Sequence, residues 1–186
     1  MGRTLHGLTL GIWGYGKIGQ RIARYGKAFG MSVLIWGSEA SRRQAELDGY
    51  TCASSKETFF SQADILSLHL RLNEATCGCV NRADLALMKA DSLLVNISRA
   101  ELIEPGALYA ELCNHPGKRA AIDVFDIEPA TPQNEPLLRL PNVLATPHLG
   151  YVEQNSYELY FRVAFENVLA FAEGRPANLV LPVSGG

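Results

Sequence analysis

The chain has 186 residues, of which 47% are hydrophobic, and its 17 lysines and arginines nearly balance 19 aspartates and glutamates. This length suits one domain with a substantial core, and the balanced charge excludes the basic excess that nucleic-acid binding favours. Neither terminus resembles a signal peptide and the apolar runs are too short to span a bilayer, so we expect a cytoplasmic protein that does not bind membranes.

Short apolar runs alternate with longer helical stretches along the chain. The runs are apolar throughout, which is typical of strands covered on both faces in a parallel sheet. The predicted strands are residues 8–13, 32–36, 64–68, 92–97, 119–125 and 143–145. The predicted helices between them are residues 17–29, 41–48, 55–62, 82–88 and 105–114. This alternation predicts a doubly wound α/β fold with a parallel sheet, spanning residues 1–152.

A last helix, predicted over residues 153–173, departs from that pattern because it is apolar around most of its circumference. A helix of this kind is buried on several sides. A single sheet cannot cover all of it, so we expect a further domain or a partner subunit to contact it. Gly-Arg-Pro at 174–176 ends the helix, and residues 179–182 are expected to form a short extended tail.

A glycine-rich turn follows the first predicted strand and opens the first predicted helix. Its Gly14, Gly16 and Gly19 have the spacing of a Rossmann-type dinucleotide-binding turn. There the first glycine permits a tight turn, the second lets the backbone approach a pyrophosphate, and the third allows close packing of helix and strand. Amides at the helix start then favour phosphate oxygens. A glycine turn without a ligand is the alternative, and the strand–turn–helix context favours the dinucleotide site.

The end of the second predicted strand is expected to select the cofactor. An acidic residue about 20 positions beyond the glycines usually binds the ribose 2′-hydroxyl of NAD, whereas Gly37 stands at this strand end. Ser38, Arg42 and Arg43 are candidates for binding the 2′-phosphate of NADP, since guanidinium groups match phosphate geometry. Glu39 favours NAD because it would repel that phosphate. Both arginines can equally be solvated residues of the next helix, so the choice between NAD and NADP stays open.

Arg99, Glu128 and His148 each lie just beyond a predicted strand. Ligands of open α/β sheets bind beyond the carboxyl ends of the strands, so we expect these three residues to converge on one crevice. Histidine titrates near neutral pH and can exchange an alcohol proton while a hydride leaves carbon. Glu128 would favour the protonated imidazole, and Arg99 would pair with a substrate carboxylate. The alternatives are a surface arginine, a loop-capping glutamate and a turn histidine. Asp123 is a candidate acceptor for a nicotinamide carboxamide.

The cysteines do not predict a metal site. Zinc ligands normally occur as two spaced pairs, and neither the Cys77–Cys79 pair nor the histidines supply that pattern. We therefore expect Cys52, Cys77, Cys79 and Cys113 to be reduced thiols.

Four sequence blocks resemble the D-isomer-specific 2-hydroxyacid dehydrogenases. They are residues 10–19, 96–100, 123–129 and 146–150, in that family's order and spacing. The resemblance implies catalytic roles for Arg99, Glu128 and His148. It also implies cofactor contacts at Gly14, Tyr15, Gly16, Lys17, Ile18, Gly19, Trp36, Gly37, Ser38, Leu70, Thr76, Ile97, Ser98, Asp123 and Gly150. Gly37 in place of a common aspartate and Arg71 in place of a frequent proline depart from the family pattern.

The same resemblance implies that this chain is part of a longer enzyme. Members of the family carry a separate substrate domain, and residues 153–186 are expected to cross toward it. The prediction is therefore the cofactor-binding and catalytic half of a homodimeric oxidoreductase, which transfers a hydride between NAD or NADP and a small 2-hydroxy or 2-oxo acid. Phosphoglycerate, glyoxylate, hydroxypyruvate and lactate types stay open, whereas formate dehydrogenases carry glutamine in place of Glu128. The alternatives are a dinucleotide-sensing binding module and a scaffold without a ligand.

Overall fold

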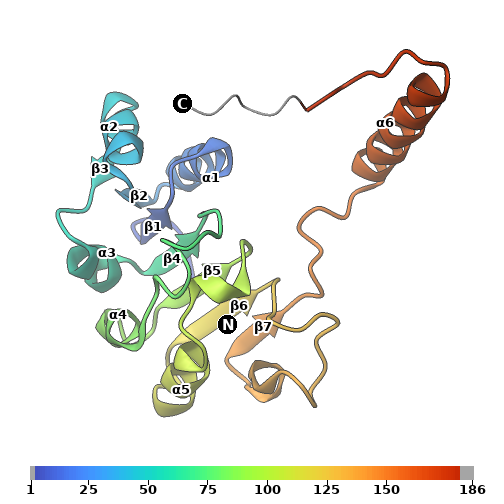
Figure 1. The fold of residues 1–186 in the computed structure, drawn as a ribbon. Helices are drawn as coiled ribbons and strands as arrows, with labels where there is room; N and C mark the ends of the chain where they lie inside the picture. The colour runs from blue at the N-terminus through green and yellow to red at the C-terminus, as the bar shows by residue number, and fades with distance from the viewer. Residues whose placement is uncertain (1–2, 181–186) are drawn as a thin grey trace. The chain divides into compact units, whose positions relative to one another are not determined.

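The computed structural model describes residues 3–180, and the chain divides into two compact units, Met1–His148 and Leu149–Gly186. The first unit contains a seven-stranded sheet in the order β3-β2-β1-β4-β5-β6-β7 (Figure 1). Every strand pairing in it is parallel. This topology is that of a doubly wound Rossmann-like sheet, as the alternation of strands and helices predicted. The division falls after His148, four residues before the predicted boundary at 152.

The strands are β1 (Thr9–Trp13), β2 (Ser32–Trp36), β3 (Thr51–Cys52), β4 (Ile65–Leu68), β5 (Leu93–Asn96), β6 (Arg119–Ile122) and β7 (Val143–Ala145). The helices are α1 (Lys17–Ala28), α2 (Glu39–Leu47), α3 (Lys56–Gln62), α4 (Arg82–Leu87), α5 (Ala107–Asn114) and α6 (Gln154–Ala172), with 3₁₀ turns η1 (Ala100–Leu102) and η2 (Pro136–Arg139). All of the predicted strands and helices are present. β3 and the two 3₁₀ turns were not predicted.

Capping and turn contacts shift several predicted boundaries. The Ser38 hydroxyl accepts a hydrogen bond from the Ser41 amide, so α2 begins at Glu39 rather than at residue 41. At the other end of the sheet, the strand predicted over 119–125 ends at Ile122. The Phe125 amide instead donates to the Glu128 carboxylate, because the chain already turns there.

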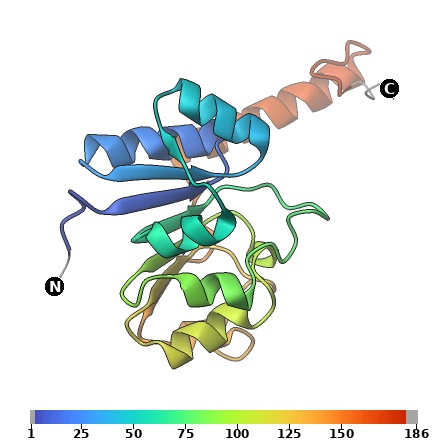
Figure 2. The same cartoon turned by 90° about the vertical axis from the view of Figure 1, so that its left-hand side faces the viewer.

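Alternate residues of the central strands build two buried clusters, one on each face of the sheet. Ile12 and Ile35 belong to the cluster that α1 and α2 cover. Trp13 and Leu34 belong to the larger cluster, which α3, α4 and α5 cover. The helices accordingly lie on both sides of the sheet (Figure 1, Figure 2). Burial on both faces explains why these strands have no alternation of polar and apolar residues.

The last residues of six neighbouring strands lie in register across the sheet: Trp36, Trp13, Leu68, Asn96, Ile122 and Ala145. The segments that follow these residues therefore begin along one edge of the sheet. This edge carries the glycine turn and the loops of Arg99, Asp123 and His148.

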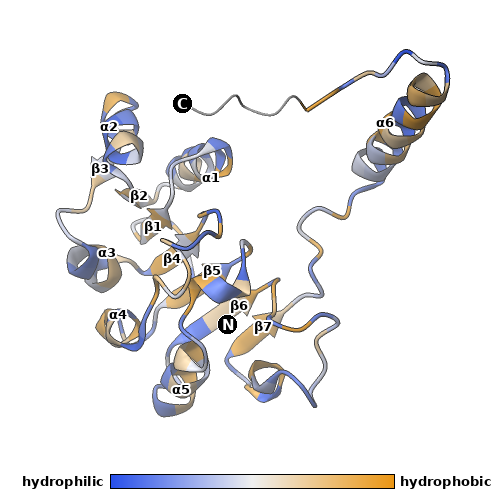
Figure 3. Ribbon diagram, in the orientation of Figure 1, coloured by the Kyte–Doolittle hydropathy of each residue, from blue (hydrophilic) through white to orange (hydrophobic). Residues whose placement is uncertain are grey.

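The second unit contains α6, which begins after Glu153. The Glu153 carboxylate caps the helix by accepting hydrogen bonds from the Asn155 and Ser156 amides. Hydrophobic residues recur along α6 (Figure 3), and none of its residues is buried within the described chain. The exposed ones are Tyr157, Leu159, Tyr160, Phe161, Phe165, Val168, Leu169 and Phe171. Of the predicted tail, residues 179 and 180 have no regular structure, and residues 181–182 lie outside the described residues.

Candidate functional site

The turn between β1 and α1 requires glycine at two positions for packing reasons. Gly14 has φ 102°, and a Cβ there would lie 2.6 Å from the His69 carbonyl oxygen. At Gly19 a Cβ would lie 2.1 Å from the Gly14 carbonyl oxygen. No side chain fits either position, since atoms at such distances overlap. These two glycines therefore bring α1 against the end of β1.

Gly16 is different, because no protein atom would oppose a side chain there. Its φ is −82°, which any residue adopts, and a Cβ would meet nothing within 4 Å. The protein's own packing thus leaves open space above the turn. No side chain among the described residues caps α1 at its start, and the first amides of a helix have no partner within the helix. Open space beside such a helix start fits a pyrophosphate.

The Tyr15 side chain does not join this space. It is 4% exposed, its hydroxyl donates to the Asp48 carboxylate at 2.9 Å, and its ring packs edge-on against Tyr50. Burial, followed by the hydrogen bond to Asp48, raises the pKa of the Tyr15 phenol. Only the backbone of Tyr15 therefore lies at the turn.

An open cavity of about 940 Å³ borders the ends of β1, β4 and β5. It is lined by Gly16, Lys17, Ile18, His69, Leu70, Arg71, Leu72, Ile97, Ser98 and Arg99. Its charged lining residues are Lys17, Arg71 and Arg99, and no carboxylate lines it. A cavity with this charge favours an anionic ligand. We call it the crevice.

His69 follows β4 and lines the crevice, although it was not among the predicted site residues. Its Nε2 lies 2.9 Å from the Ser67 hydroxyl. Burial lowers the pKa of His69 to about 4, so this imidazole is neutral at physiological pH. It therefore adds no fourth cation to the crevice.

The loop after β5 is held by hydrogen bonds that leave the Arg99 side chain at the surface. The Ser98 hydroxyl donates to the Leu68 carbonyl at 2.7 Å, and the Asn96 amide group donates to the Arg99 carbonyl at 2.8 Å. The Arg99 guanidinium donates to the Ser98 carbonyl and remains exposed. Ile97 lies between Asn96 and Ser98 in the chain and is 44% exposed. Its apolar side chain lines the same crevice as the Arg99 guanidinium.

Glu128 and His148 meet, as their positions after neighbouring strands predicted. The His148 Nδ1 atom lies 3.0 Å from each carboxylate oxygen of Glu128. A carboxylate accepts, so Nδ1 carries the hydrogen and Nε2 is the nitrogen that can exchange a proton with a ligand. The hydrogen bond from His148 is the main cause that holds the pKa of Glu128 below its usual value. The same carboxylate accepts from the Phe125 amide at 3.2 Å.

Asp123 lies at the end of β6 and is 4% exposed. Its carboxylate accepts a hydrogen bond from the Thr146 hydroxyl at 2.5 Å, and its amide donates to the Asn96 carbonyl at 3.1 Å. Thr146 was not among the predicted site residues. Its place directly after β7, two residues before His148, was the available signal.

The end of β2 carries Trp36, Gly37 and Ser38. Gly37 has φ 155°, a conformation that residues with side chains rarely adopt. The Arg42 guanidinium lies over the Trp36 ring at 4.9 Å from its centroid, and its Nε atom is buried without a hydrogen-bond partner among the described residues. Arg43 is exposed on the same helix. The structure thus places Arg42, rather than Arg43, at this strand end.

Thr76 and Gly150 complete the predicted cofactor contacts. The Thr76 hydroxyl donates to the Arg71 carbonyl at 2.7 Å, so it fixes the loop after β4 and does not line the crevice. Gly150 lies in the second unit.

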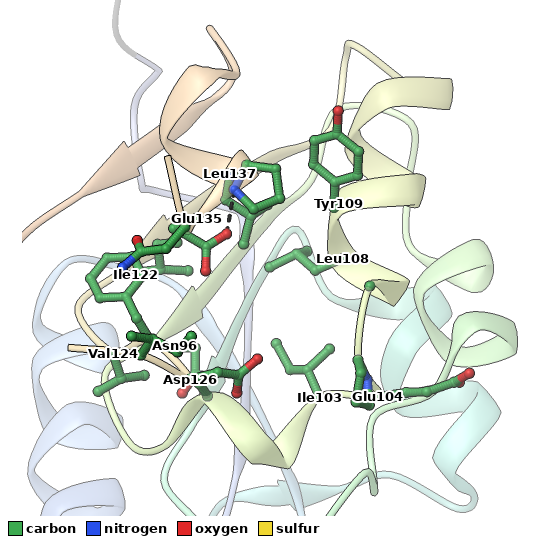
Figure 4. Close-up of a pocket in the computed structure, with 17 residues that line it drawn as sticks. Asn96, Ile103, Glu104, Leu108, Tyr109, Ile122, Val124, Asp126, Glu135 and Leu137 are labelled. Carbon is green, nitrogen blue, oxygen red and sulfur yellow. Dashed lines mark hydrogen bonds between the residues drawn. The ribbon is translucent and has the colours of Figure 1, made fainter. Parts of the chain in front are cut away.

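A second cavity, of about 230 Å³, is lined by residues of η1, α5 and η2 and by residues at the ends of β5 and β6 (Figure 4). Its walls are largely apolar, and its charged lining residues are Glu104, Asp126 and Glu135. None of the predicted catalytic residues lines it. Its acidic character disfavours an anionic ligand, so the crevice is the better candidate for a dinucleotide and an acid.

No group of His, Cys, Asp or Glu side chains within residues 3–180 is arranged to hold a metal ion. The cysteines Cys52, Cys77, Cys79 and Cys113 are free thiols. No helix in the described part of the chain is both long and apolar enough to cross a bilayer.

Comparison with known proteins gives a consistent family match. Residues 1–150 match the family model described as "D-isomer specific 2-hydroxyacid dehydrogenase, NAD binding domain". The glyoxylate reductase of Aeropyrum pernix is 39% identical over 181 residues, which are 97% of this chain and 53% of that protein. The chain thus spans about half the length of this curated relative.

Solved structures agree with this match. A phosphoglycerate oxidoreductase from Vibrio cholerae is 63% identical, with a TM-score of 0.92 over 94% of this chain and 55% of that one. A D-lactate dehydrogenase from Aquifex aeolicus, solved with NAD and lactic acid, is 30% identical with a TM-score of 0.76. That alignment covers 94% of this chain and 56% of the other.

Proposed function

Because this chain belongs to the D-isomer specific 2-hydroxyacid dehydrogenase family and contains its NAD-binding domain, we propose that the protein transfers a hydride between a nicotinamide dinucleotide and a small 2-hydroxy or 2-oxo acid. The observation that carries this proposal is the pair of His148 and Glu128, in contact at 3.0 Å. Both residues lie on segments that leave the sheet at its carboxyl edge, which is also the edge that borders the cationic crevice.

Each group in the site has a role in that reaction. The open turn at Gly16, the amides at the start of α1 and the Lys17 ammonium hold the pyrophosphate. The Arg99 guanidinium binds the substrate carboxylate and polarises the adjacent carbonyl. The bound dinucleotide supplies or accepts the hydride. The Asp123 carboxylate accepts a hydrogen bond from the nicotinamide carboxamide.

Proton transfer is assigned to His148. Its Nε2 atom donates a proton to the carbonyl oxygen during reduction and removes it from the hydroxyl during oxidation. Glu128 holds Nδ1 and stabilises the imidazolium, because its carboxylate stays charged well below neutral pH.

His148→Ala tests this assignment in the full-length protein. We expect turnover of 2-oxo acids to fall at least about a hundredfold, since general acid–base catalysis contributes about 10²–10⁴-fold. Affinity for the dinucleotide should stay within about threefold, because His148 does not line the crevice where the pyrophosphate is placed. Turnover at the wild-type rate would remove His148 from the mechanism. A wild-type protein that binds the dinucleotide but reduces no 2-oxo acid would instead be a dinucleotide-sensing module.

For the cofactor, we propose a preference for NADP(H) over NAD(H). The Gly37 backbone conformation disfavours the aspartate that binds the ribose of NAD, and the Arg42 guanidinium lies over the ring of Trp36, at the same strand end. Arg42→Ala should weaken NADPH binding about tenfold or more while changing NADH binding little, since a charge-assisted contact to phosphate is lost. Arg43→Ala, which removes the neighbouring exposed charge, is the matched control. A wild-type preference for NADH would contradict this proposal.

We also propose that the protein is a homodimer. The support is α6, whose large apolar side chains are exposed within the described chain. Sedimentation of the full-length protein checks the stoichiometry, and a monomer at micromolar concentration would contradict it.

A further inference from the structure

Thr146 joins the nicotinamide position to the catalytic histidine through three hydrogen bonds. Its hydroxyl donates to the Asp123 carboxylate at 2.5 Å, and its amide donates to the Ile122 carbonyl at 3.0 Å. Its carbonyl accepts from the His148 amide at 3.0 Å. One residue therefore contacts the end of β6 on one side and His148 on the other.

The hydroxyl matters because packing holds this segment weakly. β7 has three residues, pairs only with β6 among the described residues, and exposes 68% of Leu144. His148 itself has φ 55°, a left-handed conformation that residues with side chains rarely adopt. A conformation of this kind persists only where surrounding contacts fix it. The three hydrogen bonds of Thr146 are contacts that fix the backbone next to His148.

The other end of β7 is anchored separately. The Asn142 side chain donates to the Leu112 carbonyl at 3.1 Å and to the Lys118 carbonyl at 2.9 Å. Asn142 thus fixes where β7 begins, and Thr146 fixes where it ends. A variant of Asn142 therefore shows the effect of loosening β7 in general, and a variant of Thr146 shows the effect on the site.

Asp123 also depends on the hydroxyl. A carboxylate that is 4% exposed is costly unless donors surround it, and the short bond from Thr146 supplies one. The bond fixes the rotation of the carboxylate about its side-chain torsion. An acceptor meant for a ligand amide works best when its orientation is set before the ligand binds.

We propose that Thr146 is a positioning residue: its hydroxyl orients Asp123 for the nicotinamide carboxamide, and its carbonyl, which accepts from the His148 amide, holds His148 at a fixed place relative to that carboxylate. This inference rests on the proposed function, because it uses the assigned roles of Asp123 and His148. Beyond that function, the inference states that Asp123 and His148 are both held by Thr146.

The test compares Thr146→Val, which removes the hydroxyl at similar size, with Thr146→Ser, which keeps it. Asn142→Ala serves as the control for a loosened β7. Dissociation constants are measured on the full-length proteins for the reduced dinucleotide and for its ADP-ribose portion, which lacks the nicotinamide. Where NADPH is the preferred cofactor, the portion used carries the 2′-phosphate.

In Thr146→Val we expect binding of the reduced dinucleotide to weaken about tenfold, the value of one hydrogen bond to a charged group, and kcat to fall at least as much. Binding of the ADP-ribose portion should change less than about twofold, since it does not reach Asp123. Thr146→Ser should recover both values to within about threefold. Asn142→Ala should affect the two ligands alike.

Equal weakening of both ligands in Thr146→Val, or no weakening of either, would overturn the proposal. So would a serine variant that behaves like the valine variant. A wild-type protein that reduces no 2-oxo acid would overturn the proposed function instead, because the difference in binding between the two ligands does not depend on turnover.

Discussion

His148 and Glu128 come from loops 20 residues apart, and their contact makes the two imidazole nitrogens unequal. The carboxylate holds Nδ1, and the proposed function assigns the exchange of the substrate proton to Nε2. The Phe125 amide holds the carboxylate in turn. The residue types and their places after strands predicted this pair from sequence. The same reasoning could not place the Tyr15 side chain, because its burial depends on Asp48 and Tyr50, which come from a different helix end and loop.

Glu128→Gln tests the charge of the pair while keeping an acceptor for Nδ1. The pKa of Glu128 lies below its usual value, so the wild-type carboxylate is ionised throughout the neutral range and stabilises the imidazolium. In the proposed reaction a positive charge develops on the His148 ring, and a neutral amide stabilises this charge less than a carboxylate does. In the variant, kcat for reduction should therefore fall about tenfold or more.

The neighbouring carboxylate provides the control for that experiment. Asp126 lies in the same loop and lines the second cavity, so Asp126→Asn changes the net charge equally. Its kcat should match the wild type. An unchanged kcat in Glu128→Gln would show that the glutamate acts only as a loop cap.

His69 predicts a pH effect on stability. Burial lowers its pKa to about 4, below the ordinary value of 6.5, so the unfolded chain binds the proton more readily. Stability should therefore fall as the pH is lowered through this window. From about pH 7 to about pH 5 this residue should contribute a loss of about 1–2 kcal/mol. Denaturation at both pH values measures it, and a His69→Gln variant with equal pH dependence would contradict it.

At the level of elements, the turn between β1 and α1 contains two glycines that the packing requires and one that it does not. Gly14 and Gly19 have no room for a side chain, and Gly16 has open space. The sequence predicted this turn because the glycine spacing repeats a known geometry. It could not predict β3, which has two residues and thus no periodicity, or η2, whose start depends on the Glu135 carboxylate accepting from the Leu137 amide.

A pair of alanine variants tests the division between these glycines. Gly16→Ala should keep the free energy of unfolding within about 0.5 kcal/mol of the wild type, since its φ of −82° suits alanine. It should weaken dinucleotide binding about tenfold or more, because the methyl group enters the space for the pyrophosphate. Chemical denaturation and fluorescence titration measure the two quantities.

Gly19→Ala should show the opposite pattern. A Cβ at this position would lie 2.1 Å from the Gly14 carbonyl oxygen, so the helix must move away from the strand. We expect destabilisation of about 2–3 kcal/mol from this overpacking.

Normal dinucleotide affinity in Gly16→Ala would refute the assignment of the open space to the pyrophosphate.

For the whole molecule, the sheet and its site edge follow from the sequence, whereas the surroundings of α6 do not. Continuous apolar runs predicted parallel strands, and parallel strands bring their carboxyl ends to one edge. The apolar circumference of α6 predicted burial, yet none of its residues is buried within the described chain. The chain spans 53–55% of relatives such as those from Aeropyrum and Vibrio.

The most direct test of the proposed function follows the hydride itself in the full-length protein. Reduced dinucleotide carrying deuterium at the transferable position is mixed with a panel of 2-oxo acids, including glyoxylate and hydroxypyruvate, and the products are analysed for label and configuration. We predict deuterium on the α-carbon of a 2-hydroxy acid, with the D configuration wherever that carbon is a stereocentre, and no labelled product in His148→Ala. Dinucleotide binding without label transfer to any acid, or a labelled L product, would contradict the account.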